Sequence, residues 1–234
     1  MNTTVKKDAV LVLPSEEGVG AYLSLGADAT LQAVYECPQL PEPLRQALTG
    51  PVNWQVRNET TLGRVVKAPG LAPQFVAVLM AWGAKARFET VEAPLGAPLS
   101  KGTPSDGDEA LLAIWVPLDV EGRRWGASYV SRTPADAPIV AAVAVVDGAP
   151  DGGPVREARL ALTGVWPESS VGLAEAAKLL VGGPLNADRI QQVAAAVEDE
   201  VAPPDDFYGS ADYRRAMAGV LTRRALQACL PGKE

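Results

Sequence analysis

The sequence predicts an α+β protein in which a partial α/β lobe is followed by a three-stranded antiparallel sheet packed with three helices. Three strand patterns joined by short connections cover residues 125–131, 139–147 and 155–164, and the third alternates apolar with polar side chains. Three helical patterns then follow along the chain. Consecutive strands followed by consecutive helices are typical of the α+β class, in which helices cover one face of an antiparallel sheet.

The first part of the chain, residues 1–122, mixes short strand and helix patterns. Its clearest helix covers residues 74–83 and ends at Gly83, a natural helix stop. The apolar stripe of this helix consists of Phe75, Val78, Leu79 and Trp82. A stretch rich in proline, glycine and serine at residues 91–108 predicts a surface loop. The other elements are strands at residues 8–13, 22–25, 86–90 and 110–117 and a helix at residues 41–49.

The second part, residues 123–234, contains the three strands and the three helices named above. The first of these helices is predicted over residues 171–181 and stops at the glycine pair 182–183. The second begins at Asn186. Its apolar face consists of Ile190, Val193, Val197 and Val201.

The last helix is predicted to begin after Ser210, a good N-cap, with Asp212 in the first turn, where a negative charge suits the helix dipole. Prolines and aspartates at residues 203–206 end whatever precedes it, and a proline and a glycine at residues 231–232 end the helix. The residues expected on its apolar face are Tyr213, Met217, Val220, Leu221 and Leu226. The arginine pairs expected to be solvated or ion-paired are Arg214-Arg215 and Arg223-Arg224.

Composition limits the classes of protein that the chain can be. Its 234 residues are 47% hydrophobic, and no run of apolar residues is long enough to span a membrane. The net charge of −7 disfavours nucleic acid and anionic membranes as partners. Residues 1–7 are polar, so no secretory signal is predicted. The two cysteines, Cys37 and Cys229, are too few for a disulfide framework or an iron–sulfur cluster, which favours a reducing cytoplasm.

The sequence contains no histidine, which removes serine–histidine mechanisms and most zinc sites. No metal ligands and no catalytic residues are therefore predicted. The adjacent carboxylates Glu16-Glu17 and Asp205-Asp206 are weak candidates, because neighbouring residues rarely form an acid–base pair across a substrate. The absence of histidine favours either cofactor chemistry or a protein without chemistry of its own.

One stretch near the C-terminus, residues 205–215, has the specific motif Asp-Asp-x-x-Gly-Ser-Ala-Asp-Tyr-Arg-Arg. This stretch resembles the last helix of the flavoprotein (medium) subunits of molybdenum hydroxylases, the carbon monoxide dehydrogenase and xanthine dehydrogenase family. A second segment, residues 55–64, resembles the same family and lies in the right order. The resemblance implies that residues 1–122 are the second lobe of an FAD-binding domain and residues 123–234 the C-terminal flavoprotein-subunit domain.

The resemblance implies FAD as cofactor and a glycine turn whose backbone N–H groups approach the flavin phosphates. Arg64 stands where family members have a second glycine, so its side chain lies where the backbone must come close. If this position is left-handed, the arginine adds roughly 1–2 kcal/mol of strain, although it could instead grip a phosphate. The candidate cofactor-binding residues are Arg57, Asn58, Thr61, Leu62, Gly63, Arg64 and Tyr129.

Family members begin with a lobe that carries an Ala-Gly-Gly-Thr-Asp type loop around the FAD pyrophosphate, and this chain is expected to start after that lobe. Gly18 and Gly20 do not fit the pattern. We therefore expect a shortened relative with a degenerate flavin site, acting as a structural, assembly or docking component without oxidoreductase activity of its own. Its expected partners are a molybdopterin-binding large subunit and an iron–sulfur small subunit, or a second copy of itself.

The alternative is a working flavin subunit that transfers electrons between FAD and the iron–sulfur clusters of partner chains, with a partner supplying the missing lobe. A third interpretation, an unrelated soluble enzyme, has no motif behind it.

Overall fold

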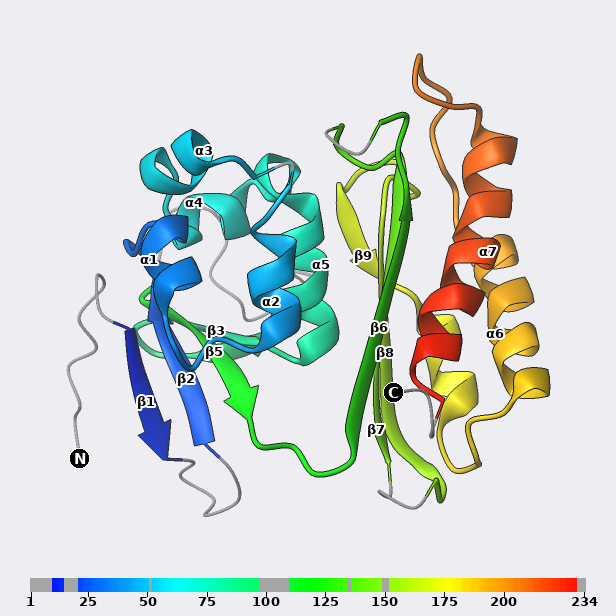
Figure 1. The fold of residues 1–234 in the computed structure, drawn as a ribbon, viewed down its shortest axis with the longest axis horizontal. Helices are drawn as coiled ribbons and strands as arrows, with labels where there is room; N and C mark the ends of the chain where they lie inside the picture. The colour runs from blue at the N-terminus through cyan, green and yellow to red at the C-terminus, as the bar shows by residue number, and fades with distance from the viewer. Residues whose placement is uncertain are drawn as a thin grey trace. The chain divides into compact units, whose positions relative to one another are not determined.

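The computed structural model describes residues 10–14, 21–50, 52–96, 110–133, 136–148 and 152–230. The chain divides into two compact units, unit 1 (Met1–Asp119) and unit 2 (Val120–Glu234), each with its own sheet (Figure 1). Strands and helices occur in both units, which confirms the α+β class. Several sequence features lie outside the described residues: Glu16-Glu17, Gly18, Gly20, most of the loop at residues 91–108, and the proline–glycine pair at residues 231–232.

Unit 1 is built on an antiparallel sheet of five strands in the order β1-β2-β5-β3-β4. The strands are β1 (Val10–Pro14), β2 (Ala21–Gly26), β3 (Lys85–Arg87), β4 (Glu92–Pro94) and β5 (Ala113–Leu118). The four strands predicted in this part are confirmed, and β4 is additional. Leu23 pairs with Val116 and Leu25 with Ile114, and all four side chains are buried, so this face of β2 and β5 forms part of the core.

Helices of unit 1 gather on one side of its sheet (Figure 1). They are α1 (Leu31–Glu36), α2 (Glu42–Ala47), α3 (Trp54–Glu59), α4 (Leu62–Lys67), the 3-10 helix η1 (Pro69–Leu71) and α5 (Pro73–Trp82). The prediction of α5 is confirmed, including its end at Gly83, whose φ of 81° is left-handed. More of α5 is buried than the predicted apolar stripe, because every residue from Phe75 to Trp82 is buried.

Unit 2 contains a four-stranded antiparallel sheet in the order β6-β7-β8-β9. The strands are β6 (Arg123–Val130), β7 (Val140–Gly148), β8 (Val155–Thr163) and β9 (Val171–Leu173). The three predicted strands are confirmed, and β9 extends the sheet at one edge. Alternate residues of β7 on one face, Val140, Ala142, Ala144 and Val146, belong to the apolar core of the unit.

The helix predicted over residues 171–181 is wrong for residues 171–173, which form a strand, and residues 175–180 form a 3-10 helix instead of an α-helix. The segment consists of β9, which pairs with β8, followed by the 3-10 helix η2 (Glu175–Leu180). Gly172 lies against the indole of Trp166, and a Cβ at this glycine would be 2.6 Å from Trp166 Nε1. Pairing with β8 and packing beneath the indole therefore decide this segment, not its local helical periodicity.

The two long helices, α6 (Ala187–Glu200) and α7 (Ala211–Ala228), lie on one face of the unit 2 sheet (Figure 1). The predicted N-cap Ser210 is confirmed, because its Oγ accepts from Tyr213 N at 3.2 Å. The predicted start of a helix at Asn186 is also confirmed, and Asn186 Oδ1 caps this helix by accepting from Arg189 N at 3.0 Å. The predicted apolar face of α6 is buried as expected. Because Gly126 has no side chain, α7 comes close to β6; a Cβ there would be 2.2 Å from Ala225 O.

The predicted face of α7 is partly wrong. Leu221 and Leu226 are buried, but Tyr213 is 40% exposed and Arg214 is only 4% exposed. The small residues Ala218 and Ala225 lie on the buried side of α7. This side therefore includes Arg214 and not Tyr213. Arg214 is buried because the backbone carbonyls around it supply acceptors from distant parts of unit 2.

No helix among the described residues is long and apolar enough to cross a membrane. In the same described ranges, no cluster of three or more aspartate, glutamate and cysteine side chains could hold a metal ion.

Candidate functional site

The segment expected to approach a flavin, residues 55–64, does not form a glycine turn. Residues 54–59 form α3, Thr60 and Thr61 are extended, and α4 begins at Leu62. Thr61 forms a bridge with Thr30 and caps α4 through its side chain. Leu62, Gly63 and Arg64 are consequently the first turn of a right-handed helix.

The backbone N–H groups of this first turn all have acceptors within unit 1. Leu62 N donates to Ala29 O at 2.9 Å, and Gly63 N donates to Ala27 O at 2.7 Å. Arg64 N lies 3.4 Å from the Thr61 hydroxyl that caps the helix. A Cβ at Gly63 would be 3.0 Å from Ala27 O, so a side chain at this position would crowd the carbonyl to which Gly63 N donates.

The two polar residues that precede this turn also bind within unit 1. Arg57 Nη1 donates to Leu48 O at 2.9 Å and to Val52 O at 2.7 Å, and its guanidinium lies 4.8 Å from the centre of the Tyr35 ring. Asn58 is exposed, and its Nδ2 donates to Trp54 O, one turn earlier in α3, at 2.7 Å. Arg57 thus ties α3 to the loop before it.

Arg64 and Tyr129 complete the set of predicted cofactor-binding residues. Arg64 is exposed and lies within α4, so its backbone is helical. Asp119 is the only non-glycine residue with positive φ in the described part of the chain. The left-handed strain considered above therefore does not arise. Tyr129 belongs to unit 2, where it lies on β6 and is 55% exposed. Cofactor binding by all seven residues stays a prediction.

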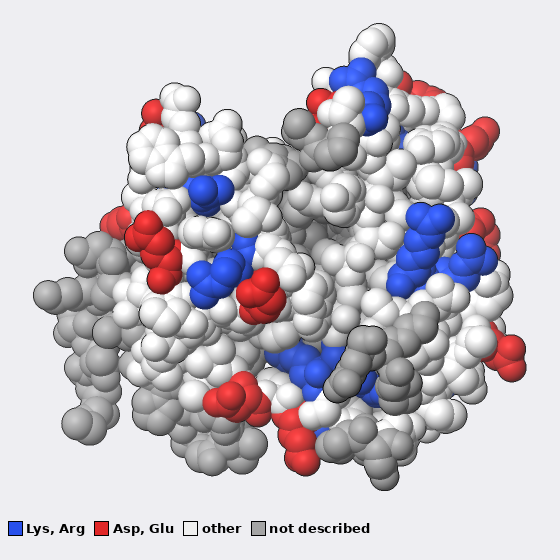
Figure 2. Space-filling view, in the orientation of Figure 1, with Lys and Arg blue, Asp and Glu red and all other residues white. Residues whose placement is uncertain are grey.

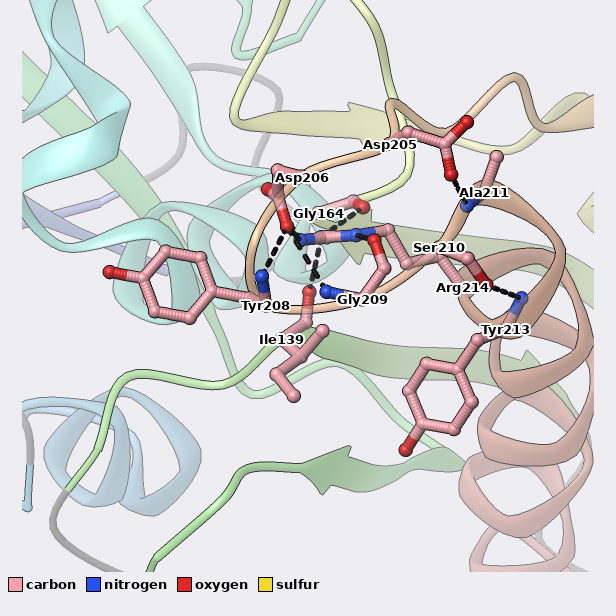
Figure 3. Close-up of polar contacts among 10 residues, drawn as sticks. All are labelled: Ile139, Gly164, Asp205, Asp206, Tyr208, Gly209, Ser210, Ala211, Tyr213 and Arg214. Carbon is pink, nitrogen blue, oxygen red and sulfur yellow. Dashed lines mark hydrogen bonds and ion pairs between the residues drawn. The ribbon is translucent and has the colours of Figure 1, made fainter.

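The C-terminal motif places a buried arginine at the centre of a polar network (Figure 3). Arg214 Nη2 donates to both carboxylate oxygens of Asp206, each at 2.6 Å. Its Nη1 donates to Ile139 O at 3.0 Å and to Gly164 O at 2.8 Å, and its Nε donates to Gly209 O at 3.3 Å. We call these five residues the Arg214 network. The expectation of an ion-paired arginine is confirmed for Arg214 and that of a solvated one is wrong.

Asp206 forms hydrogen bonds with the backbone of the loop in front of α7. Its Oδ1 accepts from Tyr208 N at 2.8 Å and from Gly209 N at 3.1 Å. The hydrogen bond from Arg214 is the main cause that lowers the pKa of the Asp206 carboxyl below its ordinary value of 3.8. Asp205 has a separate task, because its Oδ1 accepts from Ala211 N at 2.7 Å at the start of α7. The adjacent carboxylates therefore bind backbone N–H groups of the loop and of the start of α7.

Gly164 makes the network possible. Its φ of 73° is left-handed, and a Cβ at this position would be 2.0 Å from Ile139 O. A residue with a side chain would be strained and would separate the two carbonyl groups that Arg214 binds.

The loop between Asp206 and Gly209 carries two exposed aromatic rings. Phe207 is 88% exposed and Tyr208 is 55% exposed. Their ring centres are 5.8 Å apart in an edge-to-face arrangement, and the Arg132 guanidinium lies 5.8 Å from the first ring and 5.0 Å from the second. We call Phe207, Tyr208 and Arg132 the aromatic tip. None of these three residues was predicted to form an exposed cluster, although two adjacent aromatic residues between Asp206 and Gly209 are a visible signal in the sequence.

Comparison with known proteins extends over both units. Residues 127–229 match the CO dehydrogenase flavoprotein C-terminal domain. The carbon monoxide dehydrogenase medium chain of Afipia carboxidovorans is 34% identical over 124 residues, which are 51% of this chain and 40% of that protein. The corresponding medium chain of Hydrogenophaga pseudoflava is 28% identical over 186 residues, 74% of this chain and 62% of that protein.

Among solved structures, a carbon monoxide dehydrogenase from Hydrogenophaga pseudoflava is similar, with a TM-score of 0.79 and 26% identity. The match covers 98% of this chain and 80% of that one. The chain spans 40% and 62% of the lengths of the two curated relatives named above.

Proposed function

Because the chain belongs to the medium, flavoprotein subunit family of molybdenum hydroxylases, we propose that it is a structural or docking component of such a complex. In this role it binds a molybdopterin-binding large subunit and an iron–sulfur small subunit, and it binds FAD weakly or not at all. Cys37 and Cys229 are both buried and unpaired, which supports a place in the reducing cytoplasm.

The observation that carries the flavin part of the proposal is the first turn of α4. The two phosphates of FAD need convergent donors, usually backbone N–H groups in a glycine turn or at a helix start. The N–H groups of Leu62 and Gly63 already donate to Ala29 O and Ala27 O, and Arg64 N faces the Thr61 hydroxyl. A phosphate would have to displace bonds that hold α4 in unit 1, so this segment does not fit a flavin pyrophosphate.

The side chains nearby leave little binding energy for a phosphate. Arg57 donates to two backbone carbonyls, and Asn58 bonds within its own helix. The exposed Arg64 could supply one charge-assisted hydrogen bond, worth about 1.5–3 kcal/mol. A site with millimolar affinity needs about 4 kcal/mol and a micromolar site about 8 kcal/mol. These magnitudes support weak binding or none.

A melting experiment with added FAD tests the flavin part of the proposal. We expect the purified chain to be colourless, with a melting temperature that about 100 µM FAD hardly changes. A site with a dissociation constant near 1 µM would instead stabilise the protein by about 2.7 kcal/mol under these conditions. For a chain of this size, that stabilisation raises the melting temperature by about 5–10 °C. A yellow protein with such a shift would favour the electron-transfer subunit.

Co-expression tests the docking part. The chain, the molybdopterin-binding subunit and the iron–sulfur subunit of the same organism are produced together and separated by size. We expect the chain to elute with at least one of them. A chain that elutes alone over a wide range of concentrations would refute the docking role.

A further inference from the structure

Exposed aromatic side chains are costly to leave in water and are enriched at the centres of protein interfaces. Phe207 has the highest exposed fraction among the large hydrophobic residues of the described chain, at 88%. Tyr208 stands beside it, so two rings project from one four-residue loop. Exposed rings of this kind need an explanation other than packing within unit 2.

The loop that carries these rings is held in place from beneath. The Asp206 carboxylate accepts hydrogen bonds from two N–H groups of the loop and from the Arg214 guanidinium. Arg214 also donates to Ile139 O and Gly164 O. In Figure 3 the Tyr208 ring points away from this network, whereas the polar groups converge on it. Holding the loop before binding reduces the entropy lost when a partner binds, because few rotations remain to be fixed.

Arg132 gives the tip a positive charge that is open to a partner. Its guanidinium lies over both rings. Its ion partner within the chain, Asp136, is 3.8 Å away, and the two side chains are 52% and 40% exposed, so water weakens this pair. An exposed guanidinium beside two rings is complementary to a carboxylate next to an apolar pocket.

We propose that the aromatic tip is the surface by which unit 2 docks onto a partner subunit that presents an apolar pocket bordered by a carboxylate. The proposal rests on the proposed function, that this chain works in a protein complex. A protein fits better than nucleic acid, because the net charge is −7 and basic side chains occur in small, separate groups on the visible face (Figure 2). Phe207 enters the pocket, and Arg132 pairs with the carboxylate.

The test measures the affinity of the full chain for the co-expressed molybdopterin-binding and iron–sulfur subunits of the same organism. The variants are Phe207→Ala, Tyr208→Ala and the double variant. Trp54→Ala is the matched control, because Trp54 is an aromatic residue of unit 1 with a similarly high exposure of 68%. We expect the double variant to raise the dissociation constant by about 30-fold or more, as loss of an interface hot spot does. The control should stay within about threefold of the wild type.

Both rings are exposed, so the variants should fold, and an unchanged urea midpoint checks this. Arg132→Gln should reduce the dependence of the affinity on salt, since it removes the charged contact. An unchanged dissociation constant for the double variant overturns the docking surface and leaves the proposed function intact. A wild-type chain that binds neither subunit overturns both. Self-association that depends on Phe207 assigns the tip to a second copy and also overturns this proposal.

Discussion

The two segments that resemble the flavoprotein subunits use their polar groups in different ways. At the start of α4 in unit 1, the N–H groups of Leu62 and Gly63 donate to backbone carbonyls of the same unit, and so does the side chain of Arg57. In front of α7 in unit 2, the polar groups are equally occupied, but they hold up a loop with two exposed rings. The first segment uses its backbone donors within its own unit, and the second presents two aromatic side chains to solvent.

This difference shows why a matching motif does not determine a function. Arg57 and Arg214 both bind backbone carbonyls of their own unit through Nη1. The two segments differ in the side chains that they expose to solvent, which are aromatic in unit 2 and polar in unit 1. The aromatic tip of unit 2 is therefore the proposed docking surface, and flavin binding by the residues of unit 1 stays a prediction.

The largest expected effect concerns the buried arginine of unit 2. Arg214→Ala should reduce the free energy of unfolding of unit 2 by about 2–4 kcal/mol, chiefly because it leaves the carbonyls of Ile139 and Gly164 without this donor, while the Asp206 partner is 40% exposed and adds less. Hydrogen exchange of the α7 amides in urea measures this change for unit 2 alone. Arg215→Ala, at an exposed pair with Asp212, is the control and should cost at most about 0.5 kcal/mol. Equal effects of both variants would contradict a network centred on Arg214.

Arg57→Ala should have the next largest effect, in unit 1. Loss of the contacts to Leu48 O and Val52 O should cost about 1–3 kcal/mol, measured by hydrogen exchange of the α3 and α4 amides. Asn58→Ala should be nearly neutral, since Asn58 is exposed and bonds only one turn back. If Arg57→Ala left stability unchanged but removed a measurable affinity for FAD, Arg57 would be a phosphate ligand and the comparison would fail.

Acid should weaken the loop of unit 2. The Arg214 hydrogen bond lowers the pKa of Asp206 in the folded protein below 3.8, so ionised Asp206 favours folding. This stabilisation is complete above the pKa of the unfolded chain and is lost as the pH falls through the folded pKa. The difference in stability between wild type and Asp206→Asn should thus be constant near neutral pH, narrow below about pH 4, and disappear at lower pH. A difference in stability as large at pH 2 as near neutral pH would mean that the charge of Asp206 is unimportant.

The smallest expected effect is that of Arg64→Gly. This change restores the glycine of the family pattern in the first turn of α4, and it should cost at most about 1 kcal/mol, as glycine does in a helix. It should not create affinity for FAD, because the N–H groups of Leu62 and Gly63 still donate to Ala29 and Ala27. FAD binding gained by this one change would show that the arginine side chain, not the occupied donors, closes the site.

Local sequence signals predicted much of the fold. The cap at Ser210, the helix start at Asn186 and the stop at Gly83 depend on short-range hydrogen bonds and backbone angles, so they could be inferred correctly. The helix expected over residues 171–181 failed at its start because β9 is determined by pairing with β8 and by contact with Trp166, both of which lie outside the predicted segment.

The site was harder to predict than the fold. The burial of Arg214 depends on carbonyls of Ile139 and Gly164, which are 75 and 50 residues away along the chain. Periodicity placed Tyr213 on the buried face instead, because an arginine is normally assigned to solvent. Similarly, the occupied donors at Leu62 and Gly63 could not be inferred, since Ala27 and Ala29 approach them only in the folded unit.

The most direct test of the central claim is the number of flavin molecules per chain in the assembled complex. The chain is isolated with its partner subunits from its own cells, the complex is denatured, and the released flavin is quantified against the amount of this chain. A structural or docking component with occupied donors at Leu62 and Gly63 predicts a ratio close to zero. A ratio close to one, with flavin that remains bound during purification, would contradict this account and identify the chain as a working flavin subunit.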